Sequence, residues 1–579
     1  MNKPRAMKRA VLLSALLLAA AGYVYLQTAP PAPSPAAFMP SGALLYLEAP
    51  DFGRLLRDWD ASKVKADWLA SDNYEVFSRS NLFTKLHDVY TEYGAAAGFL
   101  PDMKSLTEIA GSDSALALYE IRDVDFLYIT RIADANLMKS QLWAVRGKFE
   151  QRQAGGVSFY QRTDPESKRT VAFAFAKGRL LVATRTELLA GSLELLAGGA
   201  SPSLASDRWY HDAVAAAQGP GELRLTMNLD SLGKSVYFRS YWIQHNASAV
   251  RRYWAGVADV KLSDGNITEN RVFLHAPEPA DPARSAANSA AVSGLLALVP
   301  PDAGLYKTWS VADASEPAAL IVGKLIAPQP QRARDWRYAP APTSDDDRAG
   351  NEADLETRID EQPLPADAGI TDSVAATRAL VGKAGARALL LVQSSSPAAG
   401  TFVPVASVIV LAASEDWDRD SVRSSLASSA GKLWTTSQLG AGWAGGSAGR
   451  HPIERLDGLG ALMFAIRGRL LFLSNDSRLL AATLDRVGTA SPAGAPTYAA
   501  GFRHVRERDN YRRIMAALDF SSPAGSPEFG QESRAGEPAF FSGNIGSLSR
   551  VLARVAEVRV MEEERGNATV QTVLYQMGK

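Results

Sequence analysis

Three serine–lysine pairs stand three residues apart, a spacing that places both side chains on one face of a helix. They are Ser62 with Lys65, Ser231 with Lys234, and Ser429 with Lys432. A desolvated lysine beside a serine hydroxyl can act as the base that makes the serine a nucleophile. The pattern is short, however, and a serine at the start of a helix also serves as an N-cap. Hydrolysis by Ser231 and Lys234 is therefore a hypothesis that competes with a structural role.

A glycine-rich run, residues 440–449, matches two catalytic motifs by letter. Its start fits the dinucleotide-binding pattern G-x-G-x-x-G, and its end, around Ser447, fits the nucleophile elbow G-x-S-x-G. Both motifs need a strand before them and a helix after them. Here a helical pattern precedes the run and Arg450-His451-Pro452 follows it. We therefore expect a flexible loop.

The remaining chemistry-bearing residues are sparse. The chain has six histidines and no cysteine, so disulfides, thiolate ligands and a cysteine nucleophile are excluded. No two histidines have the spacing of metal ligands, and we predict no metal site and no cofactor. Lysine plus arginine equals aspartate plus glutamate, at 62 each, so no net field favours nucleic acid.

Two runs that mix aromatic and basic residues, 77–83 and 237–245, are the best candidates for a binding surface. Arginine together with tyrosine or tryptophan is typical of interaction hot spots. We therefore predict a partner site formed by Arg79, Arg239, Tyr241 and Trp242. The alternative is an amphipathic helix whose aromatic residues are core and whose arginines are solvated.

The elements that must position these residues occur twice. Residues 171–183 and 462–474 each predict two buried strands joined by a glycine turn, Lys177-Gly178-Arg179 in one case and Arg467-Gly468-Arg469 in the other. A helix with leucines on one face follows each hairpin. Further short segments repeat in the same order, such as Val257-Ala258-Asp259 and Val555-Ala556-Glu557.

We therefore predict an α+β fold with two tandem copies of a mixed, largely antiparallel sheet with packed helices. The copies span residues 41–275 and 291–579, with a linker at 276–290. Residues 328–367 are rich in proline and aspartate, which predicts a disordered insertion. The helix-rich stretch 52–106 in the first copy has no expected counterpart in the second.

The amino terminus indicates the compartment. Basic residues in the segment 1–9 precede an uncharged apolar run, so we predict a transmembrane signal anchor at 10–27 and a proline-rich spacer at 28–40. The run is close to the minimum spanning length of about 17 residues. A removed signal peptide, cut near residues 19–21, is the alternative. The positive-inside bias places the amino terminus in the cytoplasm and the bulk in the periplasm of a bacterial inner membrane.

Residues 68–74, 77–82, 114–119 and 128–131 carry a resemblance to a known family. Through them the chain resembles uncharacterised bacterial membrane-anchored envelope proteins that carry a domain of unknown function. The resemblance covers most of the first copy. It implies the location and a duplicated α/β body, and the family offers no catalytic residues to transfer.

These observations predict an inner-membrane-anchored periplasmic protein with a non-catalytic binding or scaffolding role in the cell envelope. The membrane is contacted through the anchor, and the expected partner is an envelope protein or an anionic polymer. The alternative is an envelope hydrolase that uses Ser231 with Lys234, Ser447, or residues distant in sequence.

Overall fold

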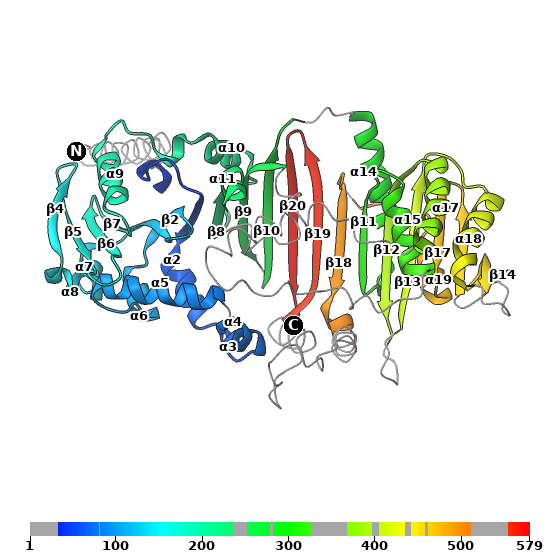
Figure 1. Ribbon diagram of the computed structural model, residues 1–579, viewed down its shortest axis with the longest axis horizontal. Coiled ribbons are helices and arrows are strands. Elements are labelled where there is room, and N and C mark those ends of the chain that lie inside the picture. Colours follow the sequence, from blue (N-terminus) through cyan, green and yellow to red (C-terminus); the bar gives the residue numbers. More distant parts are fainter. Residues whose placement is uncertain are drawn as a thin grey trace, which may run out of the picture.

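The computed structural model describes residues 33–578 apart from residues 80, 236–251, 264, 278–281, 327–367, 397–403, 435–441, 458–460, 493, 509 and 511–553. Within these residues the fold is α+β: twenty strands form one sheet with helices against both faces (Figure 1). Every strand pair in the sheet is antiparallel. The α+β class expected from the sequence is therefore confirmed.

The strands divide into two sets of ten, which we call the first half (residues 33–277) and the second half (282–578). The first half holds β1 (Leu45–Asp51), β2 (Ser112–Glu120), β3 (Asp125–Arg131), β4 (Glu150–Ala154), β5 (Val157–Thr163), β6 (Thr170–Ala176), β7 (Arg179–Ala183), β8 (Leu223–Met227), β9 (Tyr253–Ser263) and β10 (Asn266–His275). The second half holds β11 (Leu305–Ser310), β12 (Ala386–Ser395), β13 (Val405–Ala413), β14 (Gly442–Ala448), β15 (His451–Asp457), β16 (Ala461–Arg467), β17 (Leu470–Ser474), β18 (Tyr498–Arg503), β19 (Val555–Arg565) and β20 (Ala568–Met577).

Both sets follow the same spatial order from the outer edge to the middle of the sheet. The first half runs β4-β5-β6-β7-β3-β2-β1-β8-β9-β10. The second runs β14-β15-β16-β17-β13-β12-β11-β18-β19-β20. The last strands, β10 and β20, pair with each other from Ile267↔Tyr575 to Leu274↔Ala568. We call this pairing the seam, and Figure 1 shows it in the middle of the molecule.

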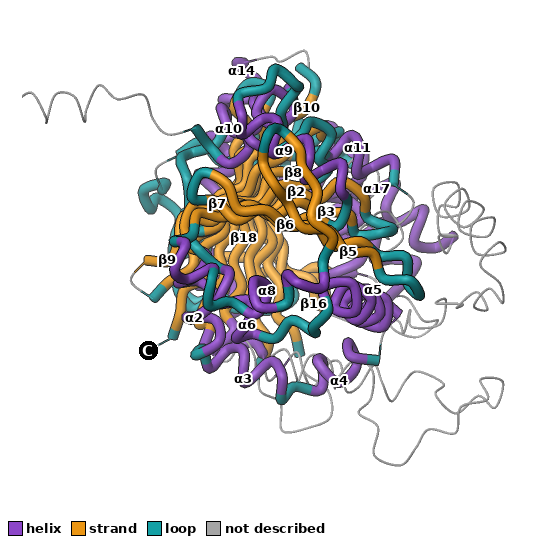
Figure 2. Tube along the Cα trace, turned by 90° about the vertical axis from the view of Figure 1, so that its left-hand side faces the viewer, coloured by secondary structure: helices purple, strands orange, loops and turns teal. Residues whose placement is uncertain are grey.

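Helices cover the two faces of the first half. One face carries α2 (Phe52–Asp60), α5 (Asn81–Ala97), α6 (Met103–Ile109), α7 (Asp134–Leu137) and α8 (Gln141–Ala144), and the opposite face carries η1 (Pro35–Phe38), α9 (Thr186–Ala197), η3 (Leu204–Ser206) and α10 (Arg208–Ala216). Figure 2 shows α2, α6 and α8 on one side of the strands and α9 and α10 on the other. The shorter α3 (Lys63–Leu69), α4 (Asp72–Ser78), η2 (Arg146–Lys148) and α11 (Leu229–Lys234) complete this half.

The second half is covered in the same way. The face continuous with that of α5 carries α15 (Ser315–Ile321), the π-helix η4 (Val322–Ile326), α17 (Ala368–Ala384) and α18 (Arg419–Trp434). The other face carries α14 (Pro282–Leu296) and α19 (Ser477–Leu484).

Both predicted glycine hairpins are confirmed. The turn between β6 and β7 consists of Lys177 and Gly178, both with positive φ, which is the type I′ geometry that suits a two-residue hairpin. The turn between β16 and β17 consists of Gly468 and Arg469, and there only the glycine has positive φ.

Three expectations were wrong. The stretch from Phe52 to Leu106 does have a counterpart, because α15, η4 and α17 lie between β11 and β12 just as α2 to α6 lie between β1 and β2. Residues 282–290 of the expected linker belong to α14, whose Val292 and Leu295 pack against the second half. Residues 442–448 form strand β14 and not a loop, since they pair with β15 along their whole length.

The predicted basic segment, anchor and most of the spacer (1–9, 10–27 and 28–32), together with the insertion at 328–367, lie outside the described residues. Among the helices that the structure does describe, none has the length and apolar character that crossing a bilayer requires.

The first prediction concerns a buried ion pair. Arg224 and Asp259 lie opposite each other on β8 and β9, with Nε–Oδ1 at 2.8 Å and Nη2–Oδ2 at 3.0 Å, and are 6% and 1% exposed. Arg224→Ala leaves a buried carboxylate without its partner, so we expect a loss of about 3–5 kcal/mol in urea denaturation.

The matched control is Arg503→Ala. Arg503 faces Glu557 across β18 and β19, but the distance between Nε and Oε1 is 3.8 Å and Arg559 also binds Glu557 at 2.9 Å. Its removal should cost less than about 1 kcal/mol. Equal losses from both variants would contradict the assignment.

Candidate functional site

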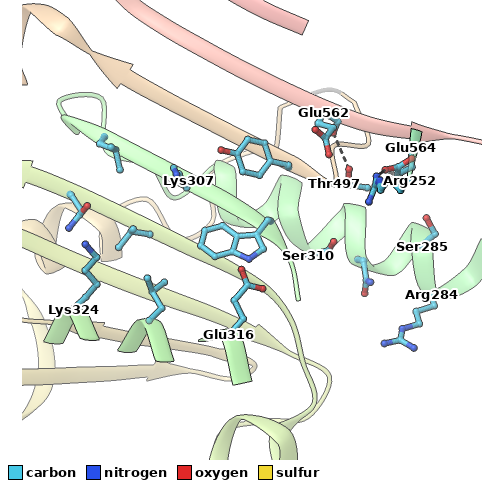
Figure 3. Close-up of a pocket in the computed structure, with 17 residues that line it drawn as sticks. Arg252, Arg284, Ser285, Lys307, Ser310, Glu316, Lys324, Thr497, Glu562 and Glu564 are labelled. Carbon is cyan, nitrogen blue, oxygen red and sulfur yellow. Dashed lines mark hydrogen bonds and ion pairs between the residues drawn. The ribbon is translucent and has the colours of Figure 1, made fainter. Parts of the chain in front are cut away.

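A polar cleft of about 920 Å³ lies on the second half beside the seam (Figure 3). Its wall comes from β11, β12, β18 and β19, from α15 and η4, and from the start of α14, and Arg252 of the first half closes one end. We call it the seam cleft. Its lining residues are Arg252, Arg284, Ser285, Asn288, Leu305, Lys307, Trp309, Ser310, Glu316, Leu320, Lys324, Leu391, Gln393, Thr497, Tyr498, Glu562 and Glu564.

Strand alternation and register place the central side chains. Successive side chains of a strand point to opposite faces, so Leu305, Lys307 and Trp309 share one face of β11. Cross-strand neighbours share a face too. Trp309 lies opposite Tyr498, and Tyr498 lies opposite Glu562. These residues therefore form one continuous patch across three strands.

The helical wall of the cleft comes from one stripe of residues. Glu316, Leu320 and Lys324 stand four residues apart along α15 and η4, a spacing that keeps side chains on one side of a helix. Figure 3 shows Glu316 and Lys324 on the helical segments that face the strands. The wall thus carries one charge of each sign.

Charge is distributed unevenly in the cleft. At the seam end, Arg252 binds Glu564 at 3.2 Å, and Glu564 also contacts His275 at 3.3 Å. Lys307 and Lys324 are exposed, and within the described chain neither has an ion pair or a hydrogen-bonding side-chain partner. Two ammonium groups are therefore available to an anionic ligand.

Two further groups in the cleft have unusual surroundings. Burial raises the pKa of Glu562, an effect that the hydrogen bond from Gln571 at 3.2 Å only partly opposes. The indole N–H of Trp309 has no acceptor among the described residues. An unpaired buried N–H of this kind costs roughly 1–3 kcal/mol.

The described lining contains hydroxyl groups, two lysines and several carboxylates. Lysine, indole and phenol groups on one open surface are typical of ligand recognition. The arrangement therefore supports a binding role for the seam cleft.

A second cavity, of about 350 Å³, lies in the first half between the sheet and the helices α2, α5 and α6. Leu47, Leu116, Tyr128 and Val182 form its sheet wall, and aromatic and aliphatic side chains of the helices form its cover. We call it the apolar cavity. Nothing in the sequence pattern distinguished its residues from ordinary core.

Of the four predicted binding residues, the structure describes one, Arg79. Arg79 follows α4, is exposed, and forms an ion pair with Glu75 at 2.5 Å. Arg239, Tyr241 and Trp242 lie outside the described residues, so a partner site on the first half stays a prediction. The residues of the seam cleft were missed, because they come from segments about 300 residues apart that only the sheet register brings together.

The serine–lysine pairs have structural roles. Ser62 caps α3 by accepting a hydrogen bond from the Lys65 amide at 3.1 Å. Lys234 is exposed and held by Asp230 at 2.7 Å, and the Ser231 amide donates to the capping Asn228 side chain at 3.0 Å.

In the third pair, Ser429 is buried and bonds Thr377 at 2.8 Å, while the side chain of Lys432 lies outside the described residues. Ser447 stands in strand β14 opposite Pro452, without the strand–turn–helix setting of a nucleophile elbow. Among the described residues, neither Ser231 nor Ser447 therefore has a lysine placed as an activating base.

No family model matches the chain, and no curated protein matches it. Two solved chains are similar to parts of it, crystal forms I and III of TP0453. Each is 11% identical to this chain. Crystal form I covers 45% of this chain and 86% of its own, with a TM-score of 0.23. Crystal form III covers 44% of this chain and 85% of its own, with a TM-score of 0.24. A likeness this weak supports no statement about fold or function.

The second prediction follows from the serine geometry. A lysine must be desolvated to act as a base, and Lys234 is instead exposed and paired. A fluorophosphonate probe should therefore leave Ser231 and Ser447 unlabelled when the modified peptides are mapped by mass spectrometry. Stoichiometric labelling of either serine would favour the hydrolase alternative.

Proposed function

We propose that the protein is a non-catalytic binding or scaffolding protein of the bacterial cell envelope, and that the seam cleft binds an anionic envelope polymer. Residues 10–27 would hold it in the inner membrane with its body in the periplasm. The observation that carries the binding role is the pair of exposed lysines, Lys307 and Lys324, beside Trp309 and Tyr498.

The chemistry of the cleft supports an extended anionic ligand with ring groups. Lysine ammonium groups attract carboxylate or phosphate without demanding one geometry. Aromatic side chains offer large, rigid contact area at low entropic cost. The cleft is open and about 920 Å³ in volume, so a polymer segment can enter it without threading.

We also propose that the two halves are tandem copies of one ancestral unit. The identical strand order in both halves supports this. The glycine hairpins between β6 and β7 and between β16 and β17 also recur at corresponding places in the two strand orders. In this view the cleft and the apolar cavity arose where the copies diverged.

The third prediction tests the cleft. The double variant Lys307→Gln with Lys324→Gln should bind dextran sulfate roughly tenfold more weakly than the unmodified protein, equivalent to about 1.4 kcal/mol in calorimetric titration. Uncharged dextran should bind neither protein.

The control is Lys104→Gln with Lys139→Gln, which removes the same charge from exposed positions of the first half. If both double variants lose affinity equally, net charge and not the cleft governs binding, and the proposed site is wrong.

The fourth prediction tests the topology. Alkaline phosphatase, which is active only outside the cytoplasm, should be active when fused after Lys579 of the full-length chain, because the basic segment 1–9 is retained in the cytoplasm. β-Galactosidase fused at the same place should be inactive. The reverse pattern would overturn the envelope assignment.

A further inference from the structure

The apolar cavity differs from ordinary core because its space is not filled by side chains. Leu116, Tyr128 and Val182 project into it from three neighbouring strands, β2, β3 and β7. Phe52 and Phe99 close it from the helical side. Protein interiors are normally packed to the density of organic crystals, so a partly open cavity of about 350 Å³ between a sheet and its covering helices is a candidate ligand site.

The polar groups around the cavity already have partners. The Tyr93 hydroxyl donates to the Asp123 carbonyl at 3.0 Å, and the Tyr128 hydroxyl lies 3.5 Å from the Ile109 carbonyl. Ser114 shares a hydrogen bond of 2.6 Å with Thr130. Little is left to bind a polar ligand, so the cavity selects for an apolar one.

The volume limits the size of that ligand. An apolar cavity of about 150 Å³ takes up benzene, which has six carbon atoms. By proportion, 350 Å³ accommodates roughly 14 carbon atoms. The lining is a continuous surface of aliphatic and aromatic groups, which suits a flexible unbranched chain.

The cavity also has a route to solvent. Leu106 both lines the cavity and is 39% exposed. Leu100, in the connection between α5 and α6, is 54% exposed, and Tyr90 of α5 is 39% exposed. Of these, Leu106 belongs to the cavity wall, so the wall reaches the surface there and a polar head group would remain in water.

In the second half the corresponding space is the seam cleft, whose Lys307, Leu391 and Tyr498 stand at the register positions of Leu47, Leu116 and Leu223. Farther from the seam on the same face, Leu389 and Leu411 belong to one packed cluster with residues of η4, α17 and α18. The apolar lining is therefore a property of the first half, because Lys307 and Tyr498 replace two leucines in the second.

We infer that the apolar cavity binds a single unbranched acyl chain of about 14 carbon atoms, with its head group outside. This site is separate from the seam cleft, and its function does not depend on the binding proposed there. The chemistry fits a free fatty acid and the chain of a single-chain lipid equally, and the experiment distinguishes the two.

The test measures displacement of cis-parinaric acid from the full-length protein by myristate and by myristoyl-lysophosphatidylethanolamine. Both should displace it if the head group stays in water, whereas displacement by myristate alone restricts the ligand to the free acid. In a series of saturated fatty acids, affinity should rise up to about 14 carbons and then level off, because further carbons would lie outside the cavity. A protein that binds neither myristoyl compound overturns the proposal.

Substitutions that fill the cavity with larger side chains test where the ligand binds. Val182→Phe and, separately, Leu116→Phe add atoms to the void from half-buried positions and should weaken myristate binding at least tenfold. Leu225→Phe is the matched control, since Leu225 is half-buried on the same sheet face but outside the cavity.

Unchanged affinity in both filled variants, or equal loss in the control, would overturn the location. If Val182→Phe fails to fold by circular dichroism, Leu116→Phe and the chain-length series decide the question.

Discussion

The pairing of β10 with β20 is the contact on which the rest of the architecture depends. Without it each half would end in a long edge strand with a row of unpaired N–H and C=O groups, which invites aggregation. Register pairs from Ile267↔Tyr575 to Leu274↔Ala568 close both edges at once. Side chains reinforce the seam, with Arg271 donating to Gln571 at 2.8 Å and Arg252 to Glu564 at 3.2 Å. The two halves therefore form one continuous sheet and not two separate domains joined by a linker.

A sheet of this width must cover two faces, and the described helices do so unevenly. In the second half, α15, η4, α17 and α18 form one packed cluster with the sheet but leave the seam cleft beside β11 and β18. In the first half, α5 and α6 cover the same face but leave the apolar cavity. Near the seam the strands carry Lys307, Tyr498 and Glu562, side chains that tolerate water. Both candidate sites therefore arise from how helices are distributed over one sheet.

Features that depend on neighbouring residues, such as turns, could be predicted from the sequence. Features that depend on strand register between distant segments could not. The turn at Lys177-Gly178 requires positive φ angles. A glycine in a short polar segment between two apolar runs predicts such a turn. The strand at residues 442–448 had no such signal, because glycine and alanine carry little strand propensity. Pairing with β15 overrides that weakness, and Trp443 packs edge-on against Phe464 at 5.2 Å between ring centroids. The seam cleft could not be predicted either. Lys307 and Glu562 have the pattern of ordinary strand residues, and only the pairing of their strands with β18 brings them to one surface.

The two sites relate differently to the proposed duplication. The apolar cavity is built within one half, so any loosening of helix packing in a single copy can create it. The seam cleft draws nearly all of its lining from the second half, and Arg252 of the first half is added at one end. Two separate copies would therefore keep both sites, but the cleft would lack Arg252, which pairs with Glu564 across the seam. Merging the sheets at β10 and β20 thus does more than protect their edges, because it adds a charged residue of the first half to the polar surface of the second.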